Sequence, residues 1–105
     1  MIYIFWTCPS REEAKKIVHL LLDQHLIACA SILPEVESIY RWKGKIEEGR
    51  EVKVILKTQR PLFDAICTVI CQHGSYEVPE IVQVDGAKCN PRYLSWVMEE
   101  TKSHK

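Results

Sequence analysis

The chain has 105 residues, which is enough for one domain with a single modest core. Lysine plus arginine and aspartate plus glutamate both number 14, so the formal net charge is zero. This balance disfavours partners such as nucleic acids and anionic membranes, whose binding proteins normally carry a basic excess. The N-terminus has no basic leader, and its apolar run is too short for a signal peptide or a membrane span. We therefore expect a cytoplasmic protein that binds neither nucleic acid nor membrane.

The chain has an odd number of cysteines, five, and none of them form a CxxC pair. They are Cys8, Cys29, Cys67, Cys71 and Cys89. Four of them lie in or beside apolar runs, which predicts reduced and mostly packed thiols. Such thiols fit the cytosol better than a disulfide framework does.

The first predicted elements are a strand and a helix. Residues 2–8 read IYIFWTC, an apolar run that is typical of a strand covered on both faces. Pro9 ends this strand, and Ser10 with Glu13 forms the capping-box pattern S-x-x-E. Apolar residues then recur at helical spacing, which predicts a helix over residues 11–25.

The segment over residues 27–42 predicts an unusually long strand, since strands of about 5–6 residues are usual. Beyond Pro34 it alternates, and one face carries Val36, Ser38, Tyr40 and Trp42. Lys43-Gly44-Lys45 predicts a hairpin turn, followed by a return strand over residues 51–58 and a bulge at Glu48-Gly49. We expect half of this hairpin to project past the domain's own sheet. Exposed strand edges and aromatic surface favour pairing with other copies in a closed, symmetric assembly.

The remaining segments complete the fold pattern. Pro61 opens a second helix, which Gly74 ends as a left-handed cap. Residues 78–85 predict a further strand, and Asn90-Pro91 begins a last helix that frays into the terminal TKSHK. The order β-α-β-β-α-β plus a terminal helix is the ferredoxin-like α+β pattern, and it occupies residues 1–105 as a single domain.

Three stretches carry a resemblance to a known family: IACASILPEVESIYRWKGKIEEGREVKVILKT, YEVPEIV and NPRYLSWV. Together they closely resemble the CutA family, the divalent-cation tolerance proteins. The resemblance covers nearly the whole chain. It implies a ferredoxin-like homotrimer with clefts between its subunits, and it implies binding of divalent metal ions, especially copper, in metal tolerance.

The metal site that the resemblance implies is only partly present. Bacterial members place a cysteine in the first strand and a His-His pair before Pro-Tyr, whereas this chain has Trp6 and the motif QHGSYEVPE. His73 therefore remains as the histidine ligand. We add Cys8, because a helix N-terminus lowers a thiol pKa, and Glu80, whose carboxylate helps to complete a divalent shell. The alternatives are a packed Cys8, a His73 that merely ends its helix, and a Glu80 on a solvated edge.

Two further sets of residues could bind ligands. Cys67 and Cys71, spaced i, i+4, could chelate a soft metal, but we favour core packing for both. The other set matches positions that the family keeps around its cleft: Tyr40, Trp42, Glu51, Lys57 and Tyr76. Aromatic side chains beside paired charges suit a small-ligand pocket, and interface packing is the alternative. Trp96 is predicted to be a core or interface residue of the last helix.

These observations favour a trimeric protein that binds Cu(II) or another divalent cation, without an organic cofactor. The alternative is a PII-like signalling module that binds a small anionic effector between subunits, although the sequence lacks a glycine-rich phosphate cradle. RNA recognition is disfavoured because EVKVILKT offers no aromatic side chain for base stacking. No catalytic set falls on one face, so we expect a protein that is not an enzyme.

Overall fold

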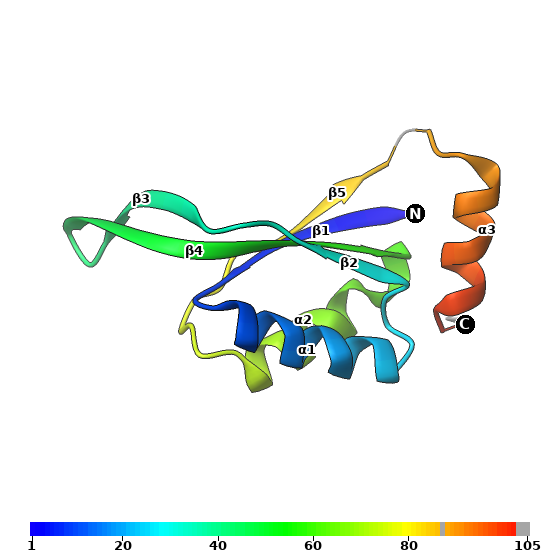
Figure 1. Ribbon diagram of the computed structural model, residues 1–105, viewed down its shortest axis with the longest axis horizontal. Helices are drawn as coiled ribbons and strands as arrows, with labels where there is room; N and C mark the ends of the chain where they lie inside the picture. The colour runs from blue at the N-terminus through cyan, green and yellow to red at the C-terminus, as the bar shows by residue number, and fades with distance from the viewer. Residues whose placement is uncertain (87, 103–105) are drawn as a thin grey trace.

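A five-stranded antiparallel sheet organises the chain in the computed structural model, which describes residues 1–86 and 88–102 (Figure 1). The elements are β1 (Ile2–Cys8), α1 (Arg11–Asp23), β2 (Cys29–Ile32), β3 (Val36–Trp42), β4 (Lys45–Thr58), α2 (Phe63–His73), β5 (Ile81–Asp85) and α3 (Pro91–Glu100). A 3-10 turn, Arg60–Leu62, precedes α2. The predicted ferredoxin-like order with a terminal helix is confirmed.

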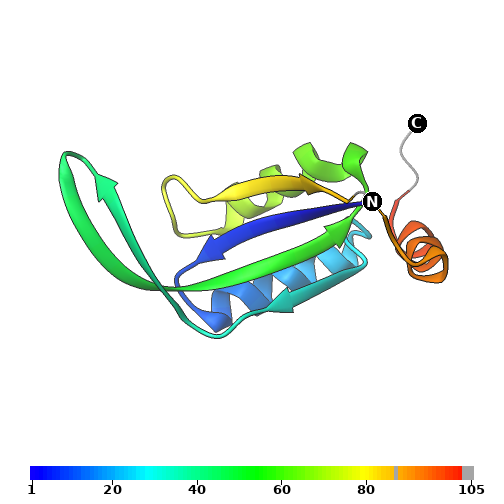
Figure 2. The ribbon, with the colours of Figure 1, turned by 90° about the horizontal axis from the view of Figure 1, so that it is seen from above.

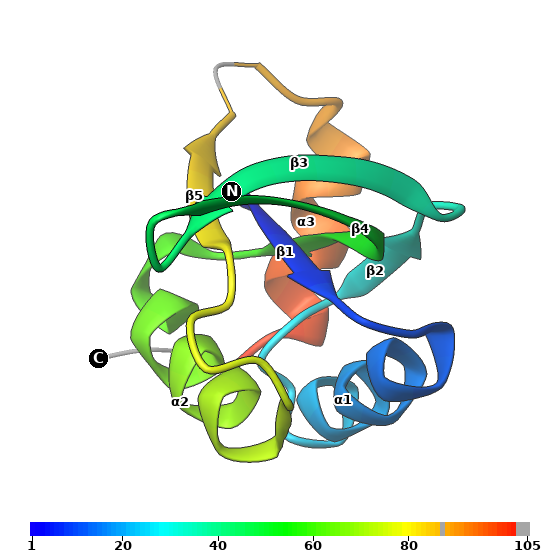
Figure 3. The same cartoon turned by 90° about the vertical axis from the view of Figure 1, so that its left-hand side faces the viewer.

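The strand order is β2-β4-β1-β5, and β3 continues the pairing along β4 (Figure 2). Helices α1 and α2 lie side by side under one face of this sheet (Figure 3). The core fills the space between them and includes Ile4, Trp6, Ile17, Leu21, Val54, Leu56, Ile66 and Ile70. None of the helices in the described ranges is long and apolar enough to cross a bilayer.

The other face of the sheet is open within one chain. Tyr3 and Phe5 are half-buried, and Val82 and Val84 of β5 are 48% and 36% exposed. The prediction that the first strand is covered on both faces is therefore wrong for a single chain. The helices supply only one apolar layer, and α3 sits at the end of the sheet instead of across it (Figure 1).

The hairpin arm formed by β3 and the first half of β4 projects well beyond the helices (Figure 1). Trp42 pairs with Lys45, and the two residues between them have φ values of 48° at Lys43 and 83° at Gly44. Two successive positive φ angles are the signature of a type I′ turn, so the predicted turn is confirmed. The return strand starts at Lys45 and is longer than expected.

The predicted bulge at Glu48-Gly49 is wrong, because these residues pair one to one with Ile39 and Ser38. The extra residue lies on the opposite strand. Between the pairs Ile32↔Val54 and Val36↔Glu51, residues 33–35 face only residues 52–53. Pro34, which has no N–H to donate, lies in this interruption. The segment over residues 27–42 is therefore two strands separated by a bulge.

The end of α1 is a Schellman motif. The Leu26 N–H donates to Leu21 O at 2.9 Å and the His25 N–H donates to Leu22 O at 3.0 Å, with His25 at φ 56°. The helix therefore stops at Asp23, two residues before the predicted end. At its start, Ser10 accepts from the Glu13 N–H at 3.2 Å, which confirms the predicted N-cap.

The later boundaries agree with the sequence in part. Gly74 has φ −82°, so it is extended and the predicted left-handed cap is wrong. β5 begins at Ile81, because residues 75–80 form a loop. Asn90 caps α3 by accepting from the Arg92 N–H at 2.9 Å, as predicted. The predicted fraying into TKSHK is wrong at its first two residues, because Thr101 is buried and the Lys102 N–H donates to His25 O at 2.8 Å. The rest of that segment, residues 103–105 with His104, lies outside the described residues.

A glycine is required at position 74 because the backbone there passes close to the carbonyl oxygen of Ile70. Its φ angle is one that other residues also adopt. A Cβ atom there would lie 2.8 Å from Ile70 O. We expect Gly74→Ala to lower the free energy of unfolding by about 1–3 kcal/mol, because the backbone must shift to relieve the clash. Gly49→Ala is the control, since its Cβ would meet only Tyr40 Oη at 3.7 Å. Urea unfolding of the two variants measures the difference, and equal stabilities would contradict this account.

Candidate functional site

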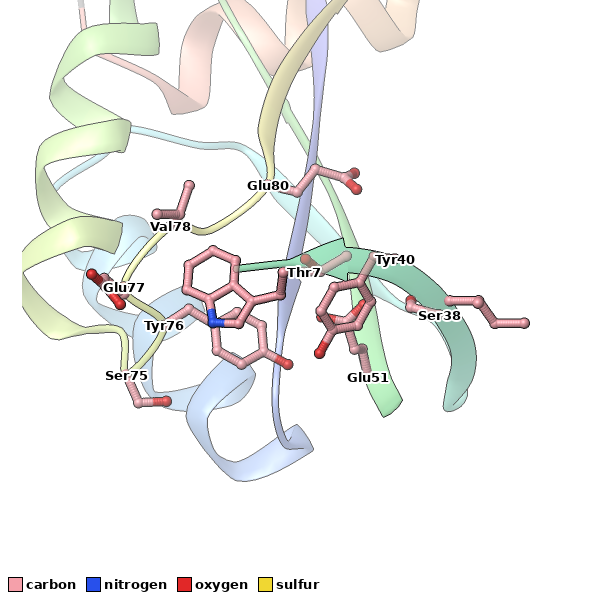
Figure 4. Close-up of a pocket in the computed structure, with 11 residues that line it drawn as sticks. Thr7, Ser38, Tyr40, Glu51, Ser75, Tyr76, Glu77, Val78 and Glu80 are labelled. Atoms are coloured by element: carbon pink, nitrogen blue, oxygen red, sulfur yellow. The ribbon is translucent and has the colours of Figure 1, made fainter. Parts of the chain in front are cut away.

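A groove of about 670 Å³ lies where the hairpin arm leaves the sheet (Figure 4). One wall comes from β3 and β4, the other comes from the loop over residues 75–80, and Thr7 of β1 lies between them. The lining residues are Thr7, Ser38, Ile39, Tyr40, Trp42, Glu51, Ser75, Tyr76, Glu77, Val78 and Glu80. Four of the six predicted cleft residues are therefore brought together within one chain.

The period-two alternation of β3 places its aromatic residues in the groove. Ser38, Tyr40 and Trp42 share one face of the strand, as the sequence predicts, and all three line the groove. Tyr40 and Trp42 are 46% and 37% exposed, so their rings are available to a ligand or to a second chain.

Tyr76 reaches across the groove from the loop toward Glu51 of β4 (Figure 4). Burial raises the pKa of Tyr76, and its hydrogen bond to the Glu51 carboxylate raises that pKa further. Tyr76 is therefore a neutral phenol throughout the physiological range, and its hydroxyl donates to Glu51. This contact links the loop to the base of the arm.

The charged side chains that line the groove are all carboxylates: Glu51, Glu77 and Glu80. Glu80 is partly neutralised, because Lys53 Nζ lies 3.2 Å from Glu80 Oε2. The Lys53 ammonium also lies 5.2 Å from the centroid of the Phe5 ring. The groove is thus an acidic, aromatic site in a chain of zero net charge, and such a site attracts cations.

Cys8 is buried at 1% exposure, and its Sγ donates to Ser10 O at 3.5 Å. Burial raises the pKa of the Cys8 thiol to about 11; the hydrogen bond to Ser10 opposes this rise, and the carboxylates of Glu13 and Glu51 add to it. The expected lowering of this pKa by the helix N-terminus is therefore wrong, because desolvation outweighs the dipole.

The three predicted metal ligands do not form a complete site in one chain. His73 is the exposed last residue of α2, Cys8 is buried, and Glu80 pairs with Lys53. Among the residues that the structure describes, no group of three or more His, Cys, Asp and Glu side chains can hold a metal ion. A metal bound at His73 or Glu80 needs donors from another molecule.

Lys57 and Trp96, the other predicted cleft residues, lie outside the groove lining. Lys57 Nζ donates to Ser31 Oγ and to Cys29 Sγ, whereas the Trp96 ring of α3 lies with its centroid 5.7 Å from that of Tyr93, at a tilt of 40°. Glu77 and Val78 also line the groove but are absent from the predicted site, since the sequence predicts a strand from Val78 onward. Pro79 was the available signal, since proline interrupts a strand ladder.

The prediction of core packing for Cys67 and Cys71 is wrong. Cys67 is half-buried and Cys71 is exposed on α2. The buried apolar stripe of this helix consists of Ile66, Val69 and Ile70, and neither cysteine belongs to it.

Comparison with known proteins gives consistent matches. The model of the CutA1 divalent ion tolerance protein family matches residues 2–100. The divalent-cation tolerance protein CutA of Pyrococcus horikoshii is 44% identical over 102 residues, covering 97% of this chain and 99% of that protein. Protein CutA of Mus musculus is 40% identical over 99 residues, covering 94% of this chain, which spans only 56% of the mouse protein.

The fold is shared with solved structures. The crystal structure of CutA1 from Oryza sativa superimposes with a TM-score of 0.94 at 31% identity, covering 98% of this chain and 94% of that chain. CutA1 from Pyrococcus horikoshii superimposes with a TM-score of 0.91 at 42% identity, covering 98% of this chain and all of that one.

The environment of Cys8 predicts an unreactive thiol. In the folded protein at pH 8, we expect a maleimide to label exposed Cys71 rapidly and Cys8 very slowly, because the thiolate is the nucleophile and Cys8 stays protonated. Peptide mapping by mass spectrometry identifies the labelled positions. Full labelling in urea is the control, and labelling of folded Cys8 as fast as Cys71 would contradict the assignment.

Proposed function

The chain belongs to the CutA1 divalent ion tolerance family, and from this premise we propose that it is a homotrimer that binds divalent copper in metal tolerance. The observation that carries the cation-binding part is that the charged side chains lining the groove are all carboxylates, those of Glu51, Glu77 and Glu80. Carboxylate oxygens and an imidazole are suitable donors for a borderline divalent ion. His73, which lies two residues before the groove-lining loop, is the imidazole that we assign to this role.

The incomplete donor set supports assembly as part of the function. One chain offers no group of three ligands among its described residues, so the coordination shell draws on donors from a neighbouring copy. We propose that sister chains also cover the open face of the sheet, where Val82 and Val84 are exposed. On the arm, Ile39 and Ile46 are 69% and 68% exposed and offer a further apolar surface.

A PII-like module that binds a small anionic effector has less support. The charged lining side chains are carboxylates, and they would repel an anion. Lys57, the basic residue that the cleft prediction included, lies outside the groove lining. We also propose a cytoplasmic location, because all five cysteines are free thiols.

The assembly proposal predicts a particle of three chains, each of 12.2 kDa, in sedimentation velocity at micromolar concentration. Val82→Lys on the open face is expected to shift the particle toward the monomer, because each interface would bury an unpaired ammonium. Ala65→Lys on the exposed side of α2 is the matched control and is expected to leave the trimer intact. A stable monomer of the unaltered protein would contradict the proposal.

The metal proposal predicts that Cu(II) quenches tryptophan fluorescence, since Trp42 lies in the groove. Replacing His73 by alanine is expected to weaken Cu(II) binding by at least about tenfold, because a nitrogen donor is lost. His19→Ala removes an exposed histidine of α1 and serves as the matched control. Equal affinities of the His73→Ala variant and the unaltered protein would exclude His73 from the site.

A further inference from the structure

Two of the five cysteines differ from the others in their surroundings. Cys8 Sγ donates to Ser10 O, Cys29 Sγ accepts from Lys57 Nζ at 3.9 Å, and Cys89 Sγ donates to Asn90 O at 3.4 Å. Across residues 1–86 and 88–102, the thiols of Cys67 and Cys71 make no hydrogen bond. These two thiols therefore lack the polar contacts that the other three make.

The helix holds the two thiols as neighbours. Cys67 and Cys71 are four residues apart on α2, so their Cβ atoms lie about 5–6 Å apart on one face. Burial raises the pKa of the Cys67 thiol, and neighbouring Cys71 and Asp64 raise it further, which is consistent with this proximity. His73 follows Cys71 at i+2 and does not face it.

This spacing favours a bridging metal over a disulfide. A disulfide needs Cβ atoms about 3.5–4.5 Å apart, which an intact helix does not provide at i, i+4. A metal ion between the sulfurs adds two bonds of about 2.3 Å each, if the Zn–S length is taken as a guide, and can span the longer gap. The two thiols therefore do not form a disulfide with each other while α2 remains folded, which leaves both available for metal binding.

We propose that Cys67 and Cys71 form a two-thiolate clip for a soft monovalent cation, Cu(I), on α2. Thiolate ligands select Cu(I), whereas the oxygen donors of the groove suit divalent ions. No third His, Cys, Asp or Glu completes a cluster within the described parts of the chain, so the clip lacks the four ligands of a structural zinc site. On binding, two S–H bonds break, two protons leave to solvent, and two S–Cu bonds form without electron transfer.

The clip is a different site from the groove and extends the proposed function to a second oxidation state of copper. Helix α2 lies under the face of the sheet that is opposite to the open one (Figure 3). Sister chains that cover the open face therefore leave this helix layer uncovered. Cys71, an exposed residue, is the entry point for the ion.

Competition with a coloured Cu(I) chelator, in oxygen-free buffer on the full chain, tests the proposal. We expect the protein to withdraw one Cu(I) per chain, and we expect Cys67→Ser/Cys71→Ser to bind at least about a hundredfold more weakly. The matched double variant Cys29→Ser/Cys89→Ser is expected to keep the affinity of the unaltered protein. X-ray absorption of the loaded protein should report two sulfur neighbours per copper.

The variants also separate this proposal from the copper(II) site. We expect His73→Ala to retain Cu(I), and the Cys67/Cys71 double variant to retain Cu(II). Cys71→Ser alone, at an exposed position that leaves the core untouched, covers the case in which the double variant misfolds and is expected to lose Cu(I) as well. Undiminished Cu(I) affinity in Cys71→Ser, or an equal loss in Cys29→Ser/Cys89→Ser, would overturn the clip.

Discussion

The backbone ladder of β4 is the interaction on which the rest of the structure depends. Its 14 residues pair with β1 and β2 over one half and with β3 over the other. In the first of these halves, Val52, Val54 and Leu56 are buried at 4% exposure or less, so the core fixes the strand in place. The arm then extends from a rigid base. Glu51 lies where the strand leaves the core, which is why a half-buried carboxylate can face the groove there.

The bulge at residues 33–35 determines which side chains line the groove. Along β2, Ala30 and Ile32 pair with Leu56 and Val54, residues of the core face. Without the bulge, Tyr40 and Trp42 would continue on that face, because side chains alternate with period two. The extra residue instead pairs Val36 with Glu51 and moves the aromatic side chains to the face that Glu51 shares. A one-residue irregularity therefore places the aromatic rings beside the carboxylates.

Local patterns in the sequence were sufficient for the order of the elements, but they did not specify every boundary or the environments of the side chains. Ser10, Asn90 and the Lys43-Gly44 turn were predictable because each acts through its nearest backbone neighbours. The raised pKa of the Cys8 thiol was not predictable in this way. The nearby helix N-terminus predicts a lower pKa, whereas burial beneath α1 and beside β4 raises it. The groove was not predictable either, because it depends on the bulge and on the loop over residues 75–80. The position of that loop is fixed by contacts such as that of Tyr76 with Glu51.

Two proposed copper sites on one small chain would differ in what they require from assembly. The groove offers oxygen donors and an incomplete shell, so a divalent ion there needs a neighbouring copy. The thiol pair on α2 needs none, because two sulfurs satisfy a Cu(I) ion by themselves. The oxidation state of the ion would then select the site: Cu(II) binding would be linked to trimer formation, whereas Cu(I) binding would be independent of it. Zero net charge suits this arrangement, since cation attraction comes from the local carboxylates of the groove while the chains avoid mutual repulsion.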